Sequence, residues 1–299
     1  MSVRYVEKIE SRLLQGAKLL PQKFIETQRN FVLSQLHAKG GFAGRLGGVD
    51  PYYTAFGLRT ADLLEIKGEF WKQNGELFFS WQGKIQHIVE CYSMLVQLRV
   101  IERNLQRDDG LSLKEASLTF IQSLTDWQGI YQEFLIMLCL GMVGEDTPQR
   151  YADELLLELH RDKGGFSQTE VENAGLNPTA AAVALLSAKD AVPSDVKEKT
   201  ALYLSSLQGD NGGFLAHEEA PETDLLSTFT ALVAAMDLGS LAQLRLGDIG
   251  RFIKTLQASG GGFRATQKDN EVDLEYTFYG IGTLALLAHI VKEKKGNKQ

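Results

Sequence analysis

The sequence predicts an all-α protein of one domain, in which six helical hairpins close into a ring. Two alternating kinds of helical segment carry this prediction: amphipathic segments with one apolar stripe, and segments that are apolar or small on every side. A helix without a polar face has to be buried all round. We find no segment with the period-two alternation of a half-buried strand. Six inner helices inside six outer ones, an (α/α)6 toroid, give every apolar segment a buried place.

A repeated sequence unit supports the same architecture. The apolar segments begin near residues 51, 88, 130, 177, 224 and 273. Four of them follow a Gly-Gly-Phe turn and a polar loop that ends in Asp or Asn, namely Gly40-Gly41-Phe42 to Asp50, Gly164-Gly165-Phe166 to Asn177, Gly212-Gly213-Phe214 to Asp224, and Gly261-Gly262-Phe263 to Asp273. Glycine supplies the left-handed backbone at a helix end, and Asp or Asn caps the next helix. An open solenoid of helix pairs is the alternative, but it does not normally bury one helix of each pair on all sides.

The ends of the chain fit the single domain 1–299. Residues 1–20 carry Val6, Ile9 and Leu13 at roughly helical spacing and predict an N-terminal helical extension. Residues 292–299 form a polar tail, for which we expect fraying. Asn74-Gly75 interrupts a run of large apolar residues and predicts a short helix followed by a turn.

Composition excludes some partners. The net charge of −7 argues against a general nucleic-acid or anionic-membrane binder, because both need a basic surface. Cys91 and Cys139 have no metal-like spacing and lie in apolar runs, which predicts buried free thiols in a reducing compartment. The first residues lack a signal-peptide core, and we see no apolar stretch near the roughly 18 residues of a membrane span. We therefore expect a cytoplasmic protein without a membrane span.

The repeated unit, with Tyr-Thr or Ser-Thr at the head of a buried helix, resembles the α/α-toroid superfamily over residues 40–290. This superfamily contains the β subunits of protein prenyltransferases, which the chain resembles most, and the squalene and terpene cyclases. The resemblance implies an isoprenoid or other apolar ligand in a central cavity. It also implies a helical α-subunit-like partner, although a homodimer is equally compatible with the sequence.

The resemblance carries over to particular residues in two ways. In the family, a penultimate repeat reads Gly-Gly-Phe-Arg, then Lys, then Asp-x-Cys-Tyr-Ser, and a His follows in the next repeat. By repeat position the match is Asp224, with Leu226 in place of the zinc-binding Cys. By local similarity the match is the last unit, with Arg264, Lys268, Asp273, Glu275 in place of Cys, and Tyr276. Under the second placement the resemblance implies that Arg264, Lys268 and Tyr276 hold an isoprenyl diphosphate; the alternative is a solvated loop with ordinary surface charges.

Neither placement retains the thiolate of the family's zinc site. We therefore expect no zinc and no zinc-dependent cysteine prenylation. The Asp-x-Asp-Asp acid of the cyclases is also missing. Asp273 and Glu275 could instead bind a divalent ion through oxygen atoms, and the alternative is that Asp273 simply caps its helix.

Aromatic residues on the inner helices complete the candidate site, among them Tyr52, Tyr53, Phe229 and Tyr279. They could line an apolar funnel, or they could be ordinary core residues.

Three functions follow from these readings, and the sequence does not decide whether the protein is an enzyme. The leading hypothesis is a prenyltransferase-like protein that binds an isoprenoid in its central cavity, with a basic rim at Arg264 and Lys268. The alternatives are a non-catalytic scaffold whose centre is filled by aromatic residues, and a divergent enzyme that uses a carboxylate-bound metal.

Overall fold

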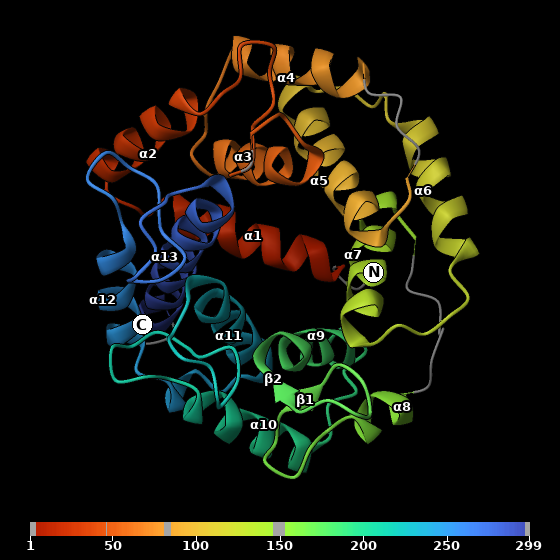
Figure 1. The fold of residues 1–299 in the computed structure, drawn as a ribbon, viewed down its shortest axis with the longest axis vertical. Helices are drawn as coiled ribbons and strands as arrows, with labels where there is room; N and C mark the ends of the chain where they lie inside the picture. Colours follow the sequence, from red (N-terminus) through yellow and green to blue (C-terminus); the bar gives the residue numbers. More distant parts are fainter. Residues whose placement is uncertain (1–3, 46, 81–84, 146–152, 297–299) are drawn as a thin grey trace.

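The computed structural model describes residues 4–45, 47–80, 85–145 and 153–296. Its helices form a closed ring with an inner and an outer layer (Figure 1). The inner helices are α3 (Pro51–Leu63), α5 (Ile88–Leu105), α7 (Ile130–Val143), α9 (Leu176–Ser187), α11 (Leu225–Leu238) and α13 (Leu274–Gly296). The outer helices are α2 (Gln22–Ser34), α4 (Glu69–Ser80), α6 (Leu111–Ser123), α8 (Asp153–Glu158), α10 (Ser194–Ser206) and α12 (Leu246–Leu256).

Each inner helix packs against the next one, and α13 packs back against α3, which closes the ring. All six inner helices begin within one residue of the predicted positions. The predicted (α/α)6 toroid is therefore confirmed, and the open solenoid is excluded.

The Gly-Gly turns need glycine because each one docks tightly on the outer helix of the following hairpin. Gly212 has a φ of +93°, and a Cβ atom there would lie 2.3 Å from the carbonyl oxygen of Asp248 on α12. The last turn docks on the first outer helix: a Cβ atom at Gly262 would meet the ring of Phe31 on α2 at 2.6 Å. The Gly262 N–H also donates to Oε1 of the buried Gln28 at 2.9 Å. This contact closes the outer layer.

The phenylalanine after each glycine pair is held by a threonine at the head of the inner helix. Its backbone N–H donates to the threonine Oγ1 at 2.9–3.1 Å, in the pairs Phe42–Thr54, Phe166–Thr179, Phe214–Thr228 and Phe263–Thr277. The four phenylalanine side chains are fully buried. The repeated unit thus fixes the angle at which a loop enters an inner helix.

The structure corrects one member of the repeat. Asp50, Asp224 and Asp273 accept from the third backbone N–H beyond them and cap their helices, as predicted. In the other repeat the cap position is Gly175, whose carbonyl accepts from Thr179 Oγ1 just as the carbonyls of Asp224 and Asp273 accept from theirs. Asn177 is therefore not the cap of this helix.

The short strands, helix α4, the C-terminal residues and the two cysteines can each be compared with the sequence-based expectation. Two short strands, β1 (Phe166–Ser167) and β2 (Ala174–Gly175), pair antiparallel within one long loop. Helix α4 runs unbroken through Asn74, because the Asn74 side chain donates to the Phe70 carbonyl and accepts from the Gly41 N–H. The polar tail continues α13 as far as Gly296. Cys91 and Cys139 are buried free thiols, as predicted.

Helix α13 also corrects the expectation about apolar stretches. It is long and apolar enough to cross a membrane by length and composition, but 61% of the relevant window is buried inside the protein. Its position as an inner helix of the ring accounts for this composition.

The N-terminal helix α1 (Tyr5–Ala17) is more than an extension. It lies across one end of the ring, from α13 towards α7 (Figure 1). It approaches α13 so closely that a Cβ atom at Gly16 would lie 1.9 Å from the carbonyl oxygen of Ala285. We call this closed end the floor, and the opposite end, which carries the Gly-Gly-Phe loops, the mouth.

A buried carboxylate anchors α1 to the floor. Asp237, near the end of α11, has a side chain with no exposed surface. It accepts from the Tyr5 hydroxyl at 2.6 Å and pairs with Lys8 Nζ and Arg12 Nη1, each at 2.9 Å. A buried carboxylate is stable only with such partners, so the floor and α11 depend on each other.

We expect Thr228→Val to lower the free energy of unfolding by about 1–3 kcal/mol, because it leaves the buried Phe214 N–H without an acceptor. Denaturation with urea measures this change. The control is Thr119→Val on the exposed face of α6, with an effect within about 0.5 kcal/mol. Equal effects of the two substitutions would contradict the role of the repeated threonine.

We expect Asp237→Asn to destabilise the protein by about 2–3 kcal/mol, because Lys8 and Arg12 lose their buried counter-charge. Amide hydrogen exchange should accelerate in α1 before it accelerates in α9. Asp210→Asn, in an exposed loop, is the control. Unchanged exchange in α1 of Asp237→Asn would show that apolar packing alone holds the floor.

Candidate functional site

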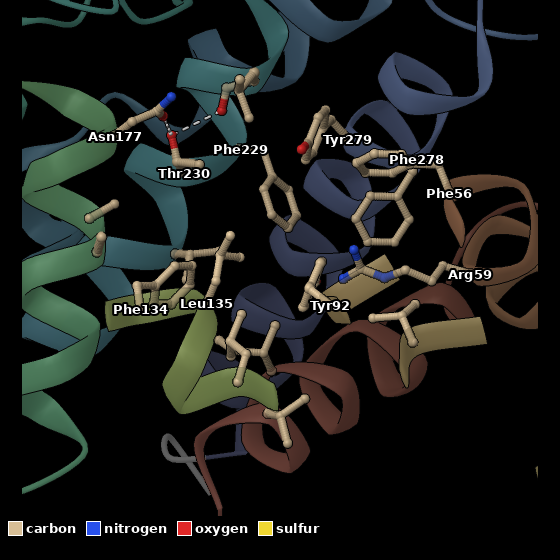
Figure 2. A pocket seen from close by; sticks show the side chains of 18 of the residues that line it. Phe56, Arg59, Tyr92, Phe134, Leu135, Asn177, Phe229, Thr230, Phe278 and Tyr279 are labelled. Atoms are coloured by element: carbon tan, nitrogen blue, oxygen red, sulfur yellow. Dashed lines mark hydrogen bonds between the residues drawn. The ribbon is translucent and has the colours of Figure 1, made fainter. Parts of the chain in front are cut away.

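A cavity of about 200 Å³ lies in the middle of the ring, between the floor and the mouth. All six inner helices and α1 line it. Its walls are mainly apolar and aromatic, with Tyr52, Phe56, Tyr92, Tyr131, Phe134, Phe229, Phe278 and Tyr279 among the lining residues (Figure 2). Ligand sites are typically enclosed, mostly apolar cavities with a few convergent polar groups.

The inner helices face the cavity with one stripe each. On α3 the stripe consists of Tyr52, Phe56 and Arg59. On α11 it consists of Leu226, the adjacent Phe229 and Thr230, and Val233. Spacings of three, four and seven residues place side chains on one face of a helix. The floor adds Tyr5, Val6, Ile9 and Glu10 from α1, on the same spacing.

Aromatic contacts between α3 and α13 form one wall of the cavity. The ring of Phe56 lies 5.7 Å from that of Phe278 and 5.4 Å from that of Tyr279. Phe229 of α11 extends this cluster, with its ring 5.3 Å from that of Tyr279. Tilted and edge-to-face contacts of this kind stabilise ring pairs and hold them in fixed orientations.

Two charged side chains from the inner helices face the cavity at different depths. Glu275, in the first turn of α13, lies at the mouth and accepts from the Tyr52 hydroxyl at 2.8 Å. Burial raises the pKa of Glu275, and the nearby Asp273 adds to the rise, against the opposing effects of Tyr52 and Arg45. Arg59, two turns into α3, lies near the floor with its guanidinium carbon 3.8 Å from the centre of the Phe278 ring.

Three carboxylates lie around Arg45 at the mouth. Arg45 Nε lies 2.6 Å from Asp273, and its Nη2 lies 2.8 Å from Asp269. Glu271 is 3.8 Å away, and the guanidinium lies over the ring of Tyr276. These contacts tie the first Gly-Gly-Phe loop to the last one.

The loops that surround the mouth differ in length, and the shorter ones leave one side of the mouth less covered. The connection between α6 and α7 spans only residues 124–129, whereas that between α10 and α11 spans residues 207–224. Tyr131 and Val89, in the first turns of α7 and α5, line the cavity and are also 45% and 37% exposed. The cavity therefore meets solvent beside these two residues.

Comparison with known families agrees with this architecture. The family model described as the prenyltransferase alpha-alpha toroid domain matches residues 11–147 and 134–299. The chain belongs to this family. No curated protein sequence matches this toroid-family protein.

The solved structures that match this chain are distant in sequence. An apo type II terpene cyclase from Scytonema superposes with a TM-score of 0.57 at 12% identity, over 94% of this chain and 99% of that one. A protein geranylgeranyltransferase-I from Candida albicans, complexed with GGPP, matches with a TM-score of 0.44 at 15% identity, over 93% of this chain and 84% of that one. At these identities the first likeness establishes the shared fold alone.

The predicted site residues of this toroid-family protein divide into two groups. Tyr52, Phe229 and Tyr279 line the cavity. Arg264, Lys268, Asp273, Tyr53 and Tyr276 do not line it.

The residues outside the cavity have other contacts. Lys268 is exposed, with its Nζ 3.7 Å from Glu222. Arg264 lies in the last Gly-Gly-Phe turn, and its buried Nε has no hydrogen-bond partner among the described residues. Asp273 caps α13 and pairs with Arg45. The predicted basic rim at Arg264 and Lys268 thus does not face the cavity.

The Asp273 and Glu275 carboxylates both have protein partners in place of a metal ion. Asp273 is bound to Arg45, and Glu275 to the Tyr52 hydroxyl. Within the described part of the chain, no three His, Cys, Asp or Glu side chains converge as a metal site. The divalent ion stays an untested prediction.

Sequence reasoning missed Arg59, Tyr92, Asn177 and the α1 residues. Arg59 and Tyr92 carried a usable signal, because each is a polar side chain within an otherwise apolar inner segment and shares a helical face with aromatic or apolar lining residues. Asn177 was hidden by its apparent match to the capping aspartates. The role of α1 had no local signal, because it depends on the ring that the helix closes.

We expect Glu275→Gln to become more stable relative to the native protein as the pH rises from 4 to 7. A raised pKa in the folded state contributes stability below the ordinary value near 4.5, and this contribution is lost as the pH rises through the folded value. Glutamine does not titrate. Urea denaturation at both pH values measures the difference, with the exposed Glu115→Gln as control. A difference that stays constant with pH would contradict the assignment.

Proposed function

We propose that the central cavity of this protein binds the hydrocarbon chain of an isoprenoid. The observation that carries the proposal is a cavity with aromatic walls at the centre of a prenyltransferase-family toroid. Unsaturated chains pack well on aromatic faces, and burial of apolar surface supplies about 25 cal/mol per Å².

The size of the cavity supports a short chain. Its volume of about 200 Å³ is below the roughly 300–1,000 Å³ of pockets for drug-sized ligands. A geranyl or farnesyl chain therefore suits it better than a geranylgeranyl chain. The floor contributes to this limit, because α1 lines the cavity at the end opposite the mouth.

The less covered side of the mouth, beside Tyr131 and Val89, offers a route by which a ligand enters the cavity. Tyr131 and Val89 are exposed and also line the cavity, so an apolar chain entering there stays in contact with apolar surface. The proposal concerns binding; it includes no transfer step, because the zinc-binding Cys and His of the prenyltransferase pattern have no counterpart in the sequence.

We expect geraniol and farnesol to bind to the purified protein in isothermal titration calorimetry, and geranylgeraniol to bind more weakly. These neutral alcohols test the hydrocarbon site alone. If none of the three binds, the proposal fails and the non-catalytic scaffold becomes the better hypothesis.

We expect Ala180→Phe to lower the affinity for farnesol by about tenfold or more, because the added ring occupies space between α9 and the opposite wall. The control is Ala116→Phe on an exposed face of α6, which should bind farnesol like the native protein. Thermal unfolding of both variants confirms that they remain folded. Unchanged binding by Ala180→Phe would move the ligand out of the central cavity.

A further inference from the structure

Arg59 is a charged group in an unusual position. Its guanidinium lies within the aromatic cavity, against the face of Phe278 and beneath Phe56 in the view of Figure 2. A guanidinium carries five N–H donors in a planar fork, and a single ring face leaves most of them available. No carboxylate of the described residues lies within ion-pair distance of it.

The acidic side chains near the floor form ion pairs with arginines other than Arg59. Glu10, which lines the same cavity, pairs with Arg99 at 2.9 Å and with Arg103 at 3.4 Å. Asp62, one turn beyond Arg59 on α3, binds Arg103 and Asn104. The positive charge of Arg59 is therefore in excess at this end of the cavity.

The Tyr92 phenol lies close to Arg59. Burial raises the pKa of Tyr92, and the adjacent Arg59 guanidinium opposes this rise. Tyr92 reaches the cavity from α5 and Arg59 from α3, so the two side chains converge from neighbouring helices. A phenol donor beside a guanidinium suits an oxyanion.

The part of the mouth around Arg45 has the opposite charge. Asp269, Glu271 and Asp273 surround Arg45, so three carboxylates face one cation. Glu275 adds a further carboxyl group at the top of the cavity. An anionic head group placed at the mouth would meet this acidic surface, whereas one placed at the floor would meet Arg59.

We propose that Arg59 and Tyr92 form an anion site at the floor, and that the ligand is an isoprenoid acid bound with its anionic head on Arg59 and its chain directed to the mouth. This inference rests on the proposed function, since it names the class of ligand that the same cavity takes. A carboxylate and a phosphate share the chemistry that the guanidinium recognises. The orientation places the head group at the opposite end from the acidic rim.

The test compares ligands that differ only in the head group. Geraniol, geranic acid, geranyl monophosphate and geranyl diphosphate are titrated into the full-length protein by calorimetry. We expect at least one of the anionic ligands to bind about tenfold or more tightly than geraniol, since a charge-assisted hydrogen bond contributes about that factor. Separate titrations of geranic acid and of the two phosphates show which anionic head group the site at the floor prefers.

The test variant is Arg59→Met, which keeps an apolar stem against Phe278. It should lose about ten- to a hundredfold in affinity for the preferred acid and a much smaller factor in affinity for geraniol. Arg107→Met, outside the cavity at the end of α5, removes the same charge and should change neither affinity. Arg59→Lys keeps the positive charge and should retain part of the preference for the anionic ligand over geraniol. This result would show that the loss in Arg59→Met comes from the missing charge and not from misfolding.

Two results overturn the inference while leaving the proposed function intact. One is a protein that binds geraniol at least as tightly as every anionic ligand. The other is a loss of acid binding in the double variant Arg264→Gln, Lys268→Gln but not in Arg59→Met, which would place the head group at the mouth. If geraniol and all anionic ligands fail to bind, the proposed function fails with the inference.

Discussion

The contact between the first and last hairpins is the constraint on which the structure depends. A helix that is apolar on every side has no stable place at the end of an open arc, because one face would meet water. Here α13 covers α3, the Tyr52 hydroxyl binds Glu275, and the last glycine turn docks on Gln28 of α2. The cavity follows from the same closure, because six helices packed side by side enclose a space that no backbone fills.

Two kinds of interaction join the first hairpin to the last and so close the ring. Between the helices the contact is aromatic, through Phe56, Phe278 and Tyr279. At the mouth it is ionic, through Arg45 and the acidic loop before α13. The aromatic contact faces the cavity, so the same side chains that complete the ring also form the wall of the proposed binding site.

The sequence was sufficient for the fold because its signals are local. A helix without a polar face, a glycine pair and a capping aspartate each act within one hairpin, and the six inner helices begin where these signals predict. The one wrong repeat, Asn177, shows the limit of this reasoning. The polar loop there forms a short hairpin, β1 to β2, and the cap falls on Gly175 instead.

The site was less predictable because its electrostatics join distant parts of the chain. Asp273 looked like a metal ligand or a cap; its neighbour Arg45 comes from the other end of the sequence. Arg264 and Lys268 matched a family pattern, but the loop carries them away from the cavity lining. Tyr52, Phe229 and Tyr279 could be placed at the cavity from their helical positions alone.

The position of α1 has a consequence for how the chain folds. This helix is synthesised before the ring helices, but its anchor Asp237 lies on α11, more than two hundred residues later. Hairpins can form locally and early, whereas pairings between distant residues pay the loop-closure entropy before they gain any contact. We therefore expect α1 to dock only after α11 and α13 have taken their places in the ring.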